Sequence, residues 1–206
     1  MKKRIFSAFL ACILVICSLS VFVSCSSEPT DIEGLKERFV YLIEESKELN
    51  VIFFGNGLPV YRRDGLLSER KMVYFNESLG NYERLMENSS YISVDHIKIS
   101  AEEIYSVDYL SEVYESAFDG IMTGETSAYV RFYDDGEYLY QHIDFYDFTL
   151  LERIYDYSTM KVVEPYSSDY VNVTIESYTL EDKTRREVEL SFVFESGNWY
   201  LDSPTY

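Results

Sequence analysis

Cysteine is scarce in this sequence and is confined to its N-terminal end. The 206 residues include three cysteines, Cys12, Cys17 and Cys25. The rest of the chain therefore has no thiol for a disulfide, a zinc site or a nucleophile. Without such groups the stability of a folded domain must come from a hydrophobic core, for which 20 Tyr, 13 Phe and one Trp supply apolar area.

Basic residues are also few. The chain has 18 Lys and Arg against 36 Asp and Glu, which gives a formal net charge of −18. A surface of this charge repels phosphate backbones and anionic lipid headgroups. The composition therefore predicts no nucleic-acid partner and no electrostatic attachment to a membrane surface, and its aromatic content excludes an unfolded acidic chain.

Catalytic and metal-binding motifs are missing as well. The sequence contains no phosphate-cradling glycine loop, no HExxH pair and no nucleophile elbow. His96 and His142 have no second His or Cys near them, so we expect no metal site there. Residues 134–137, Asp-Asp-Gly-Glu, lack the spaced ligands of a calcium loop and predict a turn. The chain thus predicts neither a cofactor nor an enzymatic activity.

The first residues predict a targeting signal. Lys2, Lys3 and Arg4 form a positive segment, and residues 5–23 are apolar apart from three serines. This run is longer than the roughly 7–15 residues usual for a secretory signal, so an uncleaved membrane anchor is the alternative. We assign residues 1–24 to a signal peptide.

The end of this run resembles the lipobox of bacterial lipoproteins. In Phe22-Val23-Ser24-Cys25, hydrophobic residues and a small residue precede a cysteine. The resemblance implies that Cys25 becomes the mature N-terminus and carries lipid on its sulfur and its amine. It also implies a protein held by acyl chains at the extracytoplasmic face of the cell membrane, with residues 25–30 as a lipidated tether and residues 31–206 as the folded domain.

Strands are predicted mainly in the C-terminal part of the chain. Residues 171–175 and 188–194 alternate between apolar and polar side chains, as half-buried strands do. Ser196-Gly197-Asn198 then reverses the chain into a last strand. Four further strands are expected, at residues 91–99, 127–133, 138–145 and 159–164.

Helices are predicted where apolar residues recur at helical spacing, at residues 31–49 and 100–117. Each begins with a capping-box pattern, Thr30 with Glu33 and Ser100 with Glu103, and Asp119-Gly120 is the expected stop of the second helix. An antiparallel sheet with one apolar face needs a cover. We therefore expect an α+β fold, with both helices packed on one curved antiparallel sheet.

An apolar stretch follows the first predicted helix. Residues 51–61, VIFFGNGLPVY, contain a Gly-Asn-Gly segment and a proline that a helix does not easily pass. We interpret the stretch as a loop, which either buries its aromatic rings as a plug, the favoured interpretation, or forms the lip of a ligand pocket. The candidate ligand-binding residues are Phe53, Phe54, Tyr61 and Trp199.

The densest basic patch comes next, at Arg62, Arg63, Arg70 and Lys71. Acidic residues outnumber basic ones, and exposed ion pairs form readily although each is weak. We therefore expect these side chains to pair with the protein's own carboxylates rather than to receive an anionic ligand.

The order of predicted elements resembles the nuclear-transport-factor-like, cystatin-related α+β architecture. Residues 197–202, Gly-Asn-Trp-Tyr-Leu-Asp, match a Gly-x-Trp turn into the last strand of that family, whose helices pack on a curved sheet to form a cone. Residues 53–59 are also similar to a stretch of uncharacterised lipoproteins of Gram-positive anaerobes. These resemblances imply a cone-like single domain and carry no particular activity.

The functional expectation is a binding or interaction module at the cell envelope that holds an envelope protein or a small apolar ligand. The alternative is a small cavity enzyme of isomerase-like type, because enzymes of the cone-shaped class use an Asp base with Tyr or Asp donors in a dry cavity. A third candidate role is docking onto another exported protein through a sheet edge.

Overall fold

The computed structural model describes residues 32–61, 81–122, 128–142, 150 and 152–206, apart from the side chains of residues 32–33, 121–122 and 128–129. Residues 31–206 form one compact unit. The expected signal peptide, the lipidated tether with Cys25, and the basic patch at Arg62, Arg63, Arg70 and Lys71 lie outside the described residues. Within the described residues, no helix combines the length and the apolar character that crossing a membrane requires.

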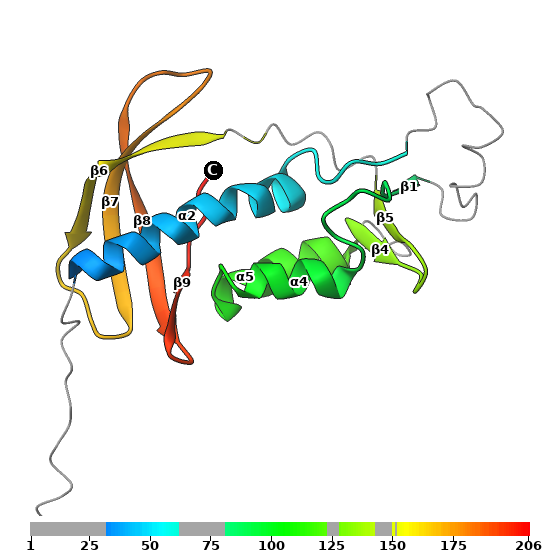
Figure 1. The fold of residues 1–206 in the computed structure, drawn as a ribbon, viewed down its shortest axis with the longest axis horizontal. Coiled ribbons are helices and arrows are strands. Elements are labelled where there is room, and N and C mark those ends of the chain that lie inside the picture. The colour runs from blue at the N-terminus through cyan, green and yellow to red at the C-terminus, as the bar shows by residue number, and fades with distance from the viewer. Residues whose placement is uncertain (1–31, 62–80, 123–127, 143–149, 151) are drawn as a thin grey trace, which may run out of the picture. The chain divides into compact units, whose positions relative to one another are not determined.

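The fold is α+β, as the sequence predicts (Figure 1). The described helices are α2 (Ile32–Phe54), α4 (Val94–Glu102) and α5 (Val107–Tyr114), and a π-helical turn, η2 (Glu115–Asp119), follows α5. The described strands are β1 (Tyr82–Arg84), β2 (Ile121–Met122), β3 (Ala128–Tyr129), β4 (Phe132–Asp134), β5 (Leu139–His142), β6 (Arg153–Val163), β7 (Tyr170–Thr179), β8 (Arg186–Glu195) and β9 (Asn198–Leu201).

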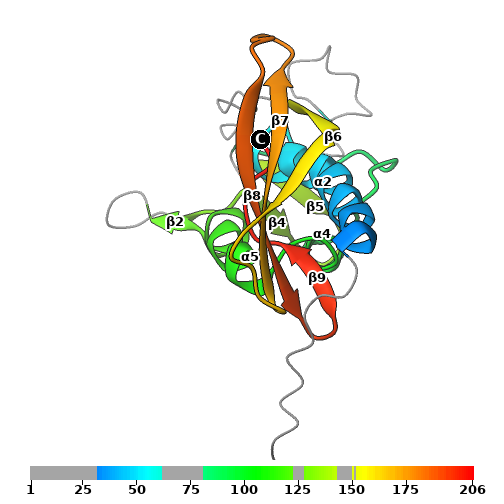
Figure 2. The same cartoon turned by 90° about the vertical axis from the view of Figure 1, so that its left-hand side faces the viewer.

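These strands form more than one sheet. The four C-terminal strands make a main sheet in the order β6-β7-β8-β9, while β1-β5-β4 and β2-β3 form two smaller sheets, and every pairing is antiparallel. The expectation of one curved sheet is therefore wrong: the described parts of the strands expected at residues 127–133 and 138–145 belong to the smaller sheets, and the C-terminal strands alone form the main sheet. Its β6 strand carries a register shift between Asp156 and Lys161, which bends a strand and increases its twist; Figure 2 shows that twist.

The predicted C-terminal meander is confirmed. Val171, Val173 and Ile175 on β7 are buried, as the alternation requires. On β8 only the central Leu190 and Phe192 are fully buried, because the ends of this long strand extend beyond the part of the sheet that is covered. The β8–β9 reversal is a two-residue turn in which both central residues have positive φ, as the tight turns favoured in hairpins require.

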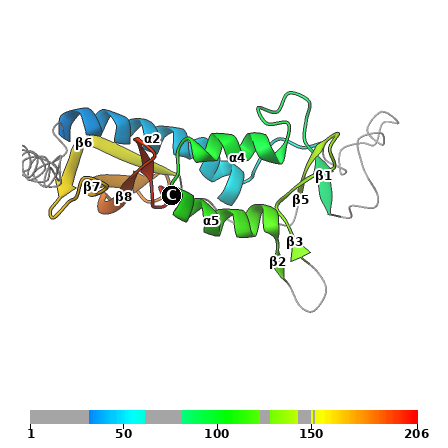
Figure 3. The same ribbon diagram turned by 90° about the horizontal axis from the view of Figure 1, so that it is seen from below.

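Helix α2 covers the apolar face of the main sheet. The Phe39 ring stacks on Phe192, with ring centroids 3.9 Å apart, and meets Trp199 edge-on at 5.6 Å. Leu42 and Ile43, one turn further along the helix, are also fully buried. Because burying one such side chain contributes about 1.5–3 kcal/mol, this face supplies a large part of the core. Figure 3 shows α2 running alongside the strands of the main sheet.

Helix α2 is longer than the sequence predicts. The expected end at Leu49 and the expected loop from Val51 are wrong, because the helix continues to Phe54. Leu49, Ile52 and Phe53 are buried at helical spacing, so the apolar run extends the buried face of the helix before Gly55 ends it. Downstream of this end, Leu58 and Val60 are buried too, which favours the plug interpretation over a ligand lip.

Two buried polar side chains hold the C-terminal end of α2. The Arg131 guanidinium donates from Nε to the Ile52 carbonyl at 2.6 Å and from Nη2 to the Gly55 carbonyl at 2.5 Å. Gln141 on β5 accepts from the Leu58 N–H at 2.7 Å and donates to the Asn56 carbonyl at 3.2 Å. Carbonyls at the end of a helix lack intrahelical donors; Arg131 provides a donor for that of Ile52, and the other contacts satisfy backbone groups of the turn that follows the helix.

Gly57 makes this arrangement possible, and its replacement provides a test. Gly57 has a φ of +72°, and a Cβ there would lie 2.1 Å from Gln141 Oε1, whereas Gly136, with a φ of +87°, has nothing within 4 Å of its Cβ position. We expect Gly57→Ala to lower the free energy of unfolding by about 2–4 kcal/mol, since a steric clash adds to the backbone cost. The control Gly136→Ala should lose only the backbone cost, about 1–2 kcal/mol. Urea unfolding measures both, and equal losses would contradict this packing.

The predicted strand at residues 91–99 is wrong, because helix α4 occupies most of it. Ser93 is the N-cap, and its hydroxyl accepts from the His96 N–H at 3.1 Å. Ile97 and Ala101, four residues apart, are buried on one helical face, while Ile99 is exposed. The apolar alternation that suggested a strand spans only a few residues. A pattern this short does not distinguish the two-residue repeat of a strand from the spacing of side chains on one face of a helix.

The second predicted helix is also shifted. Its expected capping box at Ser100 is wrong; Ser106 is the N-cap of α5 and accepts from the Tyr109 N–H at 3.0 Å. The expected stop at Asp119-Gly120 is confirmed, since η2 ends at Asp119 and Gly120 has a φ of +97°. Of the helix expected at residues 100–117, the first residues belong to the end of α4, the next form a linker, and the rest form α5 and the start of η2.

Candidate functional site

Three of the four predicted ligand residues lie near the end of α2. Phe53 is buried, and its ring centroid lies 6.0 Å from that of Phe118. Phe54 is half-buried, with its ring 4.7 Å from that of Tyr206. Tyr61 is half-buried after the Val60 bridge to Leu85.

The fourth predicted residue, Trp199, lies in a different part of the core. It is buried on β9 against Phe39 and Phe194. Phe39 precedes Phe53 by 14 positions on α2, a separation of about 21 Å along a helix. The structure therefore does not gather the four residues around one cavity, and neither of the two pockets described below is lined by any of them. Their ligand role stays a prediction.

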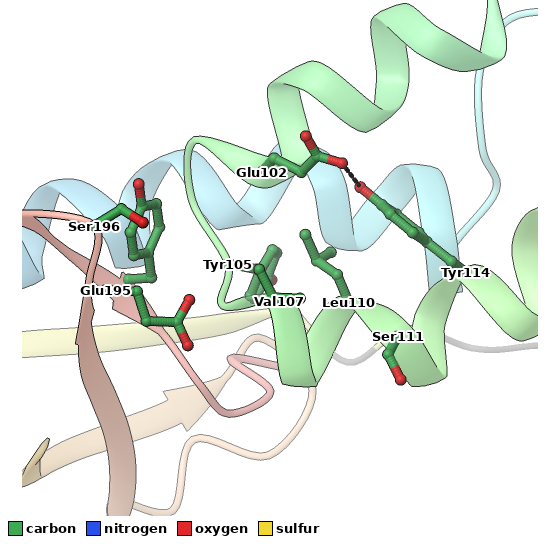
Figure 4. A pocket seen from close by; sticks show the side chains of 9 residues that line it. Glu102, Tyr105, Val107, Leu110, Ser111, Tyr114, Glu195 and Ser196 are labelled. Atoms are coloured by element: carbon green, nitrogen blue, oxygen red, sulfur yellow. Dashed lines mark hydrogen bonds between the residues drawn. The ribbon is translucent and has the colours of Figure 1, made fainter.

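The candidate site is a pocket of about 290 Å³ between the α4–α5 region and the β8–β9 turn, which we call the α5 pocket (Figure 4). Two segments far apart in the sequence form it. One segment contributes residues from the end of α4 to α5, and the other contributes residues around the turn. Its lining residues are Glu102, Tyr105, Val107, Leu110, Ser111, Tyr114, Glu195, Ser196 and Tyr200.

Backbone pairing brings these two segments together. The α4–α5 linker runs beside β9: the Leu201 N–H donates to the Ile104 carbonyl, and the Ser106 N–H donates to the Leu201 carbonyl, both at 2.9 Å. The Ser106 hydroxyl also donates to the Asp202 carboxylate. Since this linker covers the β9 edge over these residues, the edge is not free there for the sheet-edge docking considered from the sequence.

The walls of the α5 pocket are apolar and aromatic, whereas its charged groups are carboxylates. Leu110 is buried, Tyr114 and Tyr200 are half-buried, and Val107 is 70% exposed. Figure 4 shows the Glu102 carboxylate directed toward the Tyr114 hydroxyl, with Glu102 Oε1 3.5 Å away. The same hydroxyl has a shorter contact, 3.2 Å, with the Lys98 carbonyl, so its single proton is shared between the two acceptors. Burial is the main cause that raises the pKa of Tyr114, and the nearby Glu102 charge adds to it, so this phenol stays protonated as a donor at neutral pH.

Glu195 lies on the other segment of the α5 pocket. In Figure 4 its carboxylate is directed toward Val107 rather than toward Glu102. Among the described residues, no Lys or Arg side chain forms an ion pair with Glu102 or Glu195. The α5 pocket therefore combines an apolar surface with two carboxylates that no described side chain neutralises.

Behind the α5 pocket, Tyr105 joins a buried polar network. The Tyr105 hydroxyl donates to Asn50 Oδ1 on α2 at 2.7 Å, and Asn50 Nδ2 donates to Thr205 Oγ1 at 2.7 Å. Ser46 and Thr205 share a further hydroxyl hydrogen bond of 2.7 Å, and the Tyr155 hydroxyl donates to the Thr205 carbonyl at 2.8 Å. Burial raises the pKa of Tyr105, so the phenol keeps the proton that it donates.

Removing one hydroxyl tests the contribution of this network. Tyr105→Phe leaves Asn50 Oδ1 buried without that donor, and we expect the free energy of unfolding to fall by about 1–3 kcal/mol. The matched control is Tyr170→Phe, since the Tyr170 hydroxyl lies at the surface and bonds Ser191 Oγ at 3.2 Å. It should change stability by at most about 0.5 kcal/mol. If thermal or urea unfolding shows the same small loss for both variants, the network does not stabilise the fold.

A second pocket, of about 230 Å³, lies on the other side of Asn50 and Thr205. Lys47 and Arg153 line it together with Glu48 and Glu152, so it carries charges of both signs. Its lining includes Leu150 and Glu152, which flank residue 151 outside the described residues. We therefore take the α5 pocket as the candidate site.

No metal site is found in the part of the chain that the structure describes. No group of three or more His, Cys, Asp or Glu side chains there is placed to hold an ion. The expected turn at residues 134–137 is confirmed: Asp134 Oδ1 accepts from the Gly136 N–H, and Asp135 Oδ1 accepts from the Glu137 and Tyr138 N–H groups. These carboxylates serve the β4–β5 hairpin, as aspartates in turns commonly do.

Sequence reasoning missed the α5 pocket. Glu102 and Glu195 lie 93 positions apart in the chain, and nothing local indicates that they share a cavity. Two local signals were visible: Ser106 has the residue type of an N-cap, and Ser196-Gly197 has the composition of a tight turn. The pairing of the α4–α5 linker with β9, which brings these signals together, has no sequence signature.

Comparison with known proteins adds no assignment. No protein-family model matches the chain, and no curated protein matches its sequence at a significant level.

Proposed function

We propose that this chain is a binding module held by lipid on Cys25 at the extracytoplasmic face of the cell membrane. The observation that carries the binding role is the α5 pocket, a solvent-accessible cavity with an apolar wall. The attachment rests on the lipobox-like segment that ends at Cys25 and on the apolar run before it. Several acyl chains anchor a protein firmly, because each buried methylene contributes about 0.8 kcal/mol.

The shape and exposure of the α5 pocket support binding more than catalysis. Val107 and Leu110 form its apolar wall, and a cavity lined by apolar side chains with a few polar groups is typical of a ligand site. The pocket thus provides an apolar contact area and polar groups at its sides.

The isomerase-like alternative needs a carboxylate that is shielded from water, so that its pKa rises and it serves as a base. Glu102 is exposed and Glu195 is half-buried. The Glu102–Tyr114 contact has the residue types of a base and a donor, but water reaches the carboxylate. The geometry therefore favours the binding role.

Photo-crosslinking from the pocket edge tests the binding role without knowledge of the ligand. We expect p-benzoylphenylalanine at position 107, in cells, to yield a covalent adduct on irradiation, since an occupant of the α5 pocket contacts this side chain. The matched control is position 180, because Leu180 is also an exposed aliphatic residue, 61% exposed, in the β7–β8 connection. Intact mass and gel mobility measure the adduct. Equal labelling at both positions, or none at either, would contradict a binding role for the pocket.

Lipid attachment has a separate test. We expect the membrane-extracted protein to begin at Cys25 and to carry acyl mass, and Cys25→Ala to lose that mass because the sulfur is gone. Cys17→Ala is the control and should leave the mature mass unchanged, since Cys17 lies in the predicted signal peptide. Intact mass spectrometry distinguishes these forms. A mature chain that starts elsewhere, or that lacks acyl groups, would show that the anchor is wrong.

A further inference from the structure

We propose that the α5 pocket recognises an alkylammonium group, that is, an ammonium ion on an aliphatic stem. This inference rests on the proposed binding function and specifies the chemical class of the ligand. The group could belong to a free amine or to a lysine side chain of another protein. Four features of the pocket carry the argument: its carboxylates, its aromatic rings, its size and the charge of the chain.

The carboxylates provide the charge complement. Glu102 and Glu195 lie on the two segments that form the α5 pocket, and no described Lys or Arg pairs with either. No lining residue carries a positive charge. The charged lining residues therefore repel an anionic ligand, although the Lys98 ammonium lies beside the Tyr114 ring. An ammonium group gains a favourable interaction with carboxylates that are already beside the cavity.

The aromatic rings provide a second attraction for the same kind of ligand. Tyr105, Tyr114 and Tyr200 line the pocket. Tyr105 is buried and stacks on Tyr109, so the half-buried Tyr114 and Tyr200 are the rings that a ligand reaches. A cation over an aromatic face gains about 0.5–1 kcal/mol at exposed sites. The structure already shows one such contact, since Lys98 Nζ lies 5.2 Å from the centroid of the Tyr114 ring. A primary ammonium group is thus compatible with this ring.

The apolar wall and the size of the cavity indicate the rest of the ligand. Val107 and Leu110 line the same pocket as the two carboxylates and offer aliphatic contact. A volume of about 290 Å³ lies at the small end of ligand sites, so a short stem with one charged end fits better than a large ring system. The net charge of −18 adds a field that concentrates cations near the protein.

Ligand titration of the full-length protein in a non-ionic detergent tests the proposal. The probes are n-butylammonium, n-butanol and butyrate, which share the stem and differ in charge. NMR shifts of lining residues at low ionic strength should show saturable binding of butylammonium, roughly tenfold weaker binding of butanol, and no binding of butyrate. Added salt should weaken butylammonium binding because it screens the carboxylates.

Two charge-matched variants locate the interaction. Glu195→Gln should weaken butylammonium binding by about threefold to fivefold, as loss of a partly exposed ion pair does. Glu189→Gln removes the same charge from an exposed position on β8 outside the α5 pocket and should leave the affinity unchanged. Circular dichroism of both variants checks that each is folded.

The outcomes separate this inference from the proposed function. If butanol binds as tightly as butylammonium, or if both variants weaken binding equally, ammonium recognition is overturned while a binding role supported by crosslinking at position 107 stands. If no probe shifts a lining residue, the inference also fails. Nα-acetyl-lysine N-methylamide distinguishes the two sources: tighter binding than butylammonium assigns the group to a protein lysine, and weaker binding assigns it to a free amine.

Discussion

The packing of α2 against the main sheet is the contact on which the rest of the structure depends. Phe39 stacks on Phe192 and meets Trp199, and this fixes the helix across the apolar face of β8 and β9. Without it, that face would be exposed to water. The same helix extends to Phe54, where Arg131 and Gln141 from the second half of the chain bind the carbonyls and the turn that follow it. One helix therefore joins the main sheet to the smaller three-stranded sheet.

Several buried polar groups at the two ends of the α2 packing have neutral partners, despite the excess of acidic residues. Arg131 donates to carbonyl oxygens, and Tyr105, Asn50 and Thr205 form a neutral network between α2 and the C-terminal segment. Burying an unpaired carboxylate would cost several kcal/mol, and most of the described acidic side chains lie at the surface, although Glu83 on β1 is buried. Where two acidic side chains lie beside an apolar cavity, as Glu102 and Glu195 do, the result is a candidate site for a cation.

Local signals in the sequence predicted some elements well and others poorly for a physical reason. Strands β7 and β8 have ten residues each. Over that length, alternation of apolar and polar side chains fits a strand and does not fit the spacing of a helix. The segment around Ile97 has an apolar pattern too short to distinguish a strand from a helix. It forms a helix, with Ser93 as its N-cap and with Ile97 and Ala101 on the buried face. Residues 51–54 looked like the start of a loop because of Gly55 and Gly57, yet the apolar side chains before Gly55 bury one more helical turn.

The sequence by itself determined the α+β class, the C-terminal meander and the turns at Gly136 and Gly197, because strand periodicity and turn residues act over a few neighbouring positions. Tertiary structure alone decided how the strands divide among sheets, which groups bind the turn after α2 and where the α5 pocket lies. Those features depend on contacts such as Gln141 with Leu58 and Leu201 with Ile104, whose partners are dozens of positions apart. Such pairings arise only when the apolar faces pack, and no local pattern encodes them.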